Sequence, residues 1–72
     1  MMQIATIPKN AREEIRVEVQ DFKGHRLLNI RVWYDDGAGE YRPGKQGIAL
    51  RLDRLSDLCS ALEKAAELEG AA

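Results

Sequence analysis

The chain is short of the residues that cross-link small domains. Its 72 residues contain one cysteine, Cys59, and one histidine, His25, so neither an intrachain disulfide nor a Cys/His metal cluster can form. A folded chain of this length buries only about 60% of its unfolded surface, and such a core is marginal without a covalent or metal cross-link. Self-association is the stabilising device that remains, and the length excludes large multidomain enzymes.

Long apolar runs are also absent. No segment approaches the ~18 apolar residues that span a membrane, and residues 1–8 lack the basic start and cleavage site of a signal peptide. A lone thiol without a targeting segment favours a reducing compartment. We therefore expect a cytoplasmic protein, associated with the nucleoid if it is bacterial, with no membrane partner. At 44% hydrophobic and 32% charged residues, the composition is that of a globular domain.

The net charge of −1 hides an uneven distribution. Residues 23–51 hold six basic and three acidic side chains, whereas residues 52–72 hold two basic and five acidic ones. All the aromatic residues lie within or beside the basic segment. A basic middle and an acidic end predict two surfaces with different tasks, although small proteins often show such fluctuations.

Alternation of apolar and polar residues predicts an α+β fold with a sheet over the first two thirds of the chain. Two alternating runs flank the turn at Lys23-Gly24 and predict a hairpin. A short third strand is expected to end at Pro43-Gly44, because proline cannot donate to a central ladder. The simplest topology is a four-stranded antiparallel meander with strands at residues 15–20, 27–33, 40–42 and 48–52.

From Asp53 the apolar period changes from 2 to 3.6, which predicts a helix with Asp53 as N-cap and Gly70 at its end. The apolar arc covers roughly half of the circumference, more than a helix lying on one sheet needs. We expect the same helix of a second protomer to cover the rest, in a homodimer. The expected interface residues are Leu55, Leu58, Cys59 and Leu62, and the expected division is an arm (1–13), a domain (14–69) and a tail (70–72).

No constellation of residues indicates catalysis. Residues 39–45 match the glycine spacing of a phosphate-binding loop, but Gln46 stands where Ser or Thr should be and no helix follows. His25 has no Ser or Cys partner nearby in the sequence, and Asp35-Asp36 is typical of a loop. We expect no enzyme, no catalytic residue, no metal and no cofactor.

The aromatic residues suggest nucleic-acid binding. By strand parity, Phe22 and Trp33 fall on the charged face of the sheet, which Arg31 shares. Rings that stack on bases beside cations that neutralise phosphates are what single-stranded nucleic acid requires. Cross-strand aromatic packing is the alternative explanation.

Three blocks of the sequence carry a family resemblance: Phe22-Lys23-Gly24, Arg31 with the aromatic pair, and residues 43–48, Pro-Gly-Lys-Gln-Gly-Ile. With these spacings, the chain resembles the single-stranded-DNA-binding domain of the transcriptional coactivator family called positive cofactor four, as a bare domain of bacterial or phage type. The resemblance implies a curved four-stranded antiparallel sheet followed by one helix. It also implies a homodimer that binds single-stranded or melted DNA and has the transcription machinery as a further partner.

The resemblance also implies residue roles. Phe22 would stack on a base, Lys23 and His25 would contact the backbone, and Arg31 would form the channel floor. The family's stacking ring falls on Tyr34, whereas parity favours Trp33, and both remain candidates. The remaining nucleic-acid-binding residues that it implies are Arg42, Lys45, Gln46 and Gly47.

These inferences favour a homodimeric single-stranded-DNA-binding protein that acts in transcription, replication or repair. A protein-interaction module and an RNA-binding protein with the same fold are the alternatives, because base stacking alone does not distinguish the sugars.

Overall fold

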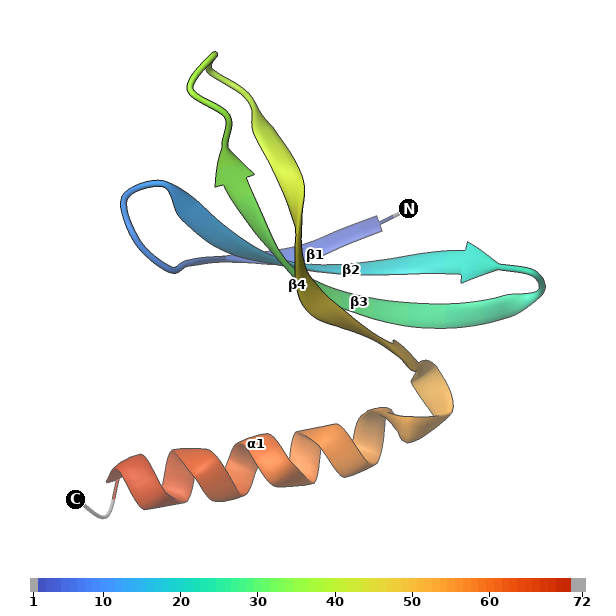
Figure 1. Ribbon diagram of the computed structural model, residues 1–72. Helices are drawn as coiled ribbons and strands as arrows, with labels where there is room; N and C mark the ends of the chain where they lie inside the picture. The colour runs from blue at the N-terminus through green and yellow to red at the C-terminus, as the bar shows by residue number, and fades with distance from the viewer. Residues whose placement is uncertain (1, 71–72) are drawn as a thin grey trace.

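The computed structural model of the protein, described here for residues 2–70, is a four-stranded antiparallel sheet followed by one helix (Figure 1). The strands are consecutive neighbours in the order β1-β2-β3-β4, so the predicted meander with a C-terminal helix is confirmed. The elements are β1 (Met2–Pro8), β2 (Glu13–Phe22), β3 (His25–Asp35), β4 (Tyr41–Arg51), the 3-10 turn η1 (Leu52–Arg54) and α1 (Leu55–Gly70).

The first strand is one that the sequence did not predict. Residues 2–8 form β1, paired with β2, where we expected an arm. A register shift between Gln3 and Ala5 places an extra residue in this strand. Such a bulge interrupts the two-residue period, which explains why alternation is weak here.

The prediction of two short strands around Pro43 is wrong, because β4 runs without a break from Tyr41 to Arg51. Pro43 lies opposite Trp33, beside a register shift between Arg31 and Trp33. Proline is tolerated at this place because β4 is an edge strand of the sheet, where a missing N–H need not cost a ladder hydrogen bond.

A tight turn joins β2 to β3 and fixes their register. Lys23 has φ 51° and Gly24 has φ 80°, and two positive φ angles are those of a type I′ turn. From this turn the pairing runs without interruption from Phe22–His25 to Glu13–Tyr34. This continuous ladder is the rigid frame on which the candidate site residues are placed.

The sheet has a thin core. Its apolar face carries Ile15, Val17 and Val19 of β2 opposite Val32, Ile30 and Leu28 of β3. Among the described residues, Leu28 is the one apolar residue that is buried, at 6% exposure. Glu18, on the other face of the sheet, is buried to a similar degree. Within residues 2–70, no second layer of secondary structure covers either face of the sheet.

The helix α1 stands away from the sheet (Figure 1) and buries none of its residues. Of the expected interface residues, Leu55 and Leu58 are half-buried, whereas Cys59 and Leu62 are exposed. Asp53 lies inside η1, so the predicted N-cap is displaced and the helix begins at Leu55. Within residues 2–70, no helix is long and apolar enough to cross a bilayer.

Candidate nucleic-acid interface

The turn between β2 and β3 presents an aromatic ring beside cations. Phe22 is 53% exposed, so its side chain is accessible to solvent. The Lys23 Nζ atom lies 5.4 Å from the centroid of this ring, and His25 is the cross-strand neighbour of Phe22. The expected group of Phe22, Lys23 and His25 is therefore brought together at one end of the sheet.

Trp33 and Tyr34 have different surroundings. The Arg16 guanidinium lies 4.1 Å from the centroid of the Trp33 ring and 5.6 Å from that of Tyr41. Arg16 Nε also donates to Glu14 Oε2 at 2.7 Å. The Arg16 guanidinium, which Glu14 holds in place, thus covers one side of the Trp33 ring. Tyr34, in contrast, is 41% exposed. Of the two candidate rings, Tyr34 is the more accessible one.

Tyr34 lies at the end of the ladder farthest from the turn. It is the cross-strand neighbour of Glu13 on β2 and of Arg42 on β4. Its ring helps to line a hollow of about 370 Å³ to which Lys45 and Gln46 of β4 also contribute. The structure therefore brings together the predicted residues Tyr34, Lys45 and Gln46.

The Arg31 side chain of β3 forms a hydrogen bond with β4. Its Nη1 atom donates to the carbonyl of Gly44 at 3.0 Å, so the guanidinium is part-buried and held. Opposite Arg31 lies Gly47, where a Cβ atom would come within 2.8 Å of the Ile30 carbonyl. The glycine at position 47 therefore allows β4 to approach β3 closely.

Arg42 of β4 has a partner in the loop that precedes this strand. Its Nε atom donates to Asp36 Oδ2 at 2.8 Å. The Ala38 N–H, together with this guanidinium, lowers the pKa of the Asp36 carboxyl below its ordinary value. Arg42 is therefore less available to a phosphate than Lys45, for which no ion pair occurs among the described residues.

The predicted site residues fall into two groups. Phe22 and Tyr34 lie at opposite ends of the β2–β3 pairing, about 30 Å apart along the strand. They also differ in parity, since Phe22 belongs to the face of Arg16 and Tyr34 to the face of Ile15. A single chain does not gather all of the predicted residues on one continuous surface.

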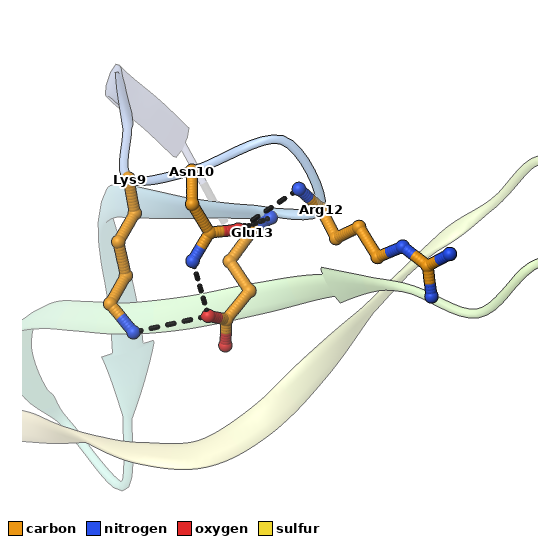
Figure 2. Close-up of polar contacts among 4 residues, drawn as sticks. All are labelled: Lys9, Asn10, Arg12 and Glu13. Atoms are coloured by element: carbon orange, nitrogen blue, oxygen red, sulfur yellow. Dashed lines mark hydrogen bonds and ion pairs between the residues drawn. The ribbon is translucent and has the colours of Figure 1, made fainter.

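Sequence reasoning missed the contribution of Arg16, Lys9 and Glu13. Figure 2 shows Lys9 and Glu13 in the polar cluster between β1 and β2. A signal for two of them was available. The two-residue turn at 23–24 fixes the register, which places Glu13 opposite Tyr34 and places Arg16 two pairs away from Trp33, on the same face. Lys9 had no such signal, because its position depends on the unpredicted strand β1.

The chain is similar to known transcriptional coactivators. The family model for Transcriptional Coactivator p15 (PC4) matches residues 9–61. The chain is 43% identical over 44 residues to the RNA polymerase II transcriptional coactivator SUB1 of Saccharomyces cerevisiae, covering 60% of this chain and 15% of that protein. It is 37% identical over 49 residues to the RNA polymerase II transcriptional coactivator of Drosophila melanogaster, covering 68% and 44%. The chain spans less than half the length of either relative.

Solved structures agree with the family match. A PC4 homolog from Burkholderia pseudomallei superimposes with a TM-score of 0.82 at 30% identity, covering 89% of this chain and 86% of that one. The bacteriophage T5 homolog of the eukaryotic coactivator PC4, implicated in recombination-dependent DNA replication, gives a TM-score of 0.77 at 25% identity, covering 96% and 80%. With a family model that matches most of its length and this shared fold, the chain belongs to the PC4 family.

Proposed function

We propose that this protein binds single-stranded or melted DNA and does so as a homodimer. The observation that carries the proposal is the exposure of Phe22, an aromatic residue that is 53% exposed. Folding gains little from an apolar ring left in solvent. Base stacking explains why this ring is exposed, since each base has a π-face that stacks on an aromatic side chain.

The charges around the exposed rings support the same function. Lys23 and His25 lie beside Phe22, and Lys45 lines the hollow beside Tyr34. At each end of the β2–β3 ladder, these cations can neutralise phosphates of a strand whose bases stack on the ring beside them. His25 and Gln46 replace residues for which the family resemblance suggests lysine, so we expect fewer phosphate contacts than two lysines would give.

Surface area supports the homodimer. The chain exposes 5742 Å², whereas a folded monomer of 8.1 kDa is expected to expose about 4,500 Å². The excess of about 1,200 Å² per chain exceeds the ~800 Å² that each partner buries in a standard interface. Leu62 at 58% exposure and Leu68 at 77% lie on the uncovered helix, so we propose that α1 of a second copy packs there.

Regulation of transcription is the proposed biological role, with the transcription machinery as a further partner. The two curated relatives are named as RNA polymerase II transcriptional coactivators. A single-strand-binding dimer also suits replication or repair, and the bacteriophage T5 homolog is implicated in replication. The proposed location is the cytoplasm.

The deciding experiment is a titration of labelled oligonucleotides of one sequence as single-stranded DNA, duplex DNA and RNA, by fluorescence anisotropy. Tight binding of the DNA single strand with weak duplex binding supports the proposal. Equal affinity for RNA would make this an RNA-binding protein, and absence of binding to all three would favour a protein-interaction module. Sedimentation equilibrium at micromolar concentration tests the homodimer, and a folded monomer there would refute it.

A further inference from the structure

A polar cluster stands at the edge of the hollow beside Tyr34. The hollow of about 370 Å³ is lined by Lys9 of the β1–β2 connection, by Glu13 at the start of β2, and by Tyr34, Lys45 and Gln46. Lys9, Asn10 and Glu13 point toward one another in Figure 2. The hollow therefore combines an accessible ring, a carboxylate and two cations.

The Glu13 carboxylate is held in place from one side. Its Oε1 atom accepts from Lys9 Nζ at 3.1 Å and from Asn10 Nδ2 at 2.7 Å. The Asn10 side-chain oxygen accepts from the Glu13 N–H at 2.9 Å, so the side chain and the turn fix each other. Asn10, followed by Lys9, lowers the pKa of the Glu13 carboxyl, which is ionised at neutral pH.

The second oxygen of this carboxylate is left as an acceptor. All hydrogen bonds to the Glu13 side chain from residues 2–70 reach Oε1. The side chain is 31% exposed, and the residue lines the hollow. An ionised carboxylate can only accept hydrogen bonds, so Oε2 is suited to a donor that enters the hollow.

The position of the Tyr34 ring beside Glu13 determines which ligand fits the hollow. Glu13 and Tyr34 are directly opposed across β2 and β3, which places their Cβ atoms about 5 Å apart. Gly44 keeps space open beside the ring, because a Cβ atom there would lie 3.7 Å from Tyr34 Cδ1 and 2.9 Å from the Val32 carbonyl. A base stacked on this ring would have its edge beside the Glu13 carboxylate.

We propose that Glu13 is a specificity-determining residue, which favours a base with an exocyclic amine over thymine in the Tyr34 hollow. Cytosine presents an N4 amine, which donates to a carboxylate oxygen. Thymine presents the O4 acceptor at the same position, and two acceptors facing each other repel. This inference rests on the proposed single-strand binding and adds a base preference to it.

The test compares three oligonucleotides of equal length, of deoxycytidine, of thymidine and of the 2-pyrimidinone deoxynucleoside, which is cytosine without its amine. Binding is measured by anisotropy at mildly alkaline pH, where cytosine stays unprotonated. We expect the wild-type protein to bind the cytosine strand about fivefold more tightly than each of the others, the value of one hydrogen bond. Glu13→Gln should abolish the preference for cytosine over thymine, because its amide can accept from the N4 amine or donate to O4.

Glu67→Gln is the matched control. It removes the same charge from the exposed helix α1 and should keep the wild-type preference. Equal wild-type affinities for cytosine and 2-pyrimidinone strands would overturn the inference while leaving single-strand binding intact, and this comparison needs no variant. A preference for cytosine over thymine that is retained in a folded Glu13→Gln protein would also overturn it. Absence of binding to all three strands would refute the proposed function itself.

Discussion

Replacing Phe22 by alanine tests whether its ring binds DNA or packs in the core of the protein. A fully buried phenylalanine costs ~3–5 kcal/mol of stability when it is cut back to alanine. Phe22 is 53% exposed, and truncation at the surface leaves no cavity. We expect a loss of about 1 kcal/mol in the free energy of unfolding. The Lys23 ammonium loses its contact with the ring, worth about 0.5 kcal/mol at an exposed site.

The effect on DNA binding should be larger. One base–aromatic stack contributes ~1–3 kcal/mol, so Phe22→Ala should weaken single-strand affinity by a factor of about 5–150. Urea unfolding gives the stability, and anisotropy with a labelled single strand gives the affinity. Phe22→Leu is the control, because it keeps the apolar bulk but removes the π-face, and its affinity should be nearly as low as that of the alanine variant.

The two rings of β3 provide an internal comparison. Tyr34→Ala should behave as Phe22→Ala does, because its ring is accessible. Trp33→Ala should mainly lower stability, since the Trp33 ring packs beneath Arg16. A Phe22→Ala protein that unfolds, with unchanged affinity per folded molecule, would refute the reasoning, because its aromatic ring would then belong to the core.

Three further predictions concern the dimer, the charge of the proposed DNA-binding surface and the stability of the protein in acid. Leu62→Asp should dissociate or unfold the protein, because an unpaired charge is buried in the proposed interface; sedimentation showing an intact dimer would contradict it. Gln46→Lys should tighten single-strand binding and steepen the salt dependence by about 0.7 in log–log slope; an unchanged slope would place Gln46 outside the contact surface. The pKa of Asp36 is lowered from 3.8, so its stabilising contribution is present above that value and is lost as pH falls through the lower folded pKa. Asp36→Asn should therefore lower the thermal midpoint at neutral pH and flatten its decline on acidification, and a parallel decline in both proteins would argue against this.

The regular part of the fold could be predicted from the sequence. Alternation at residues 15–20 and 27–33 reflects a sheet with one apolar face, and the change of period after Asp53 reflects the helix. The strand β1 could not be predicted, because the bulge after Gln3 disrupts its alternation. The continuity of β4 through Pro43 could not be predicted either, because the sequence does not reveal which strand is at the edge.

The candidate site was predicted where it depends on local sequence and missed where it depends on register. Phe22 is followed by a turn that holds it at a strand end, and its exposure follows from that position. The difference between Trp33 and Tyr34 depends on Arg16, a residue that is distant in the sequence and arrives through strand pairing. The role proposed for Glu13 depends in addition on Lys9 and Asn10, which the β1–β2 connection brings to it.

Because β2 pairs with β3 without interruption, a change of length in the turn between them has a larger effect than a change of length in the other connections. One residue added within the turn at 23–24 would shift the register and turn every side chain of β3 to the opposite face relative to β2. That single event would part Trp33 from Arg16 and Tyr34 from Glu13. The connections at 9–12 and 36–40 adjoin ladders that already contain register shifts, so length changes there can be absorbed locally. The length of one turn, more than the identity of any one side chain, therefore sets the geometry of both ends of the sheet.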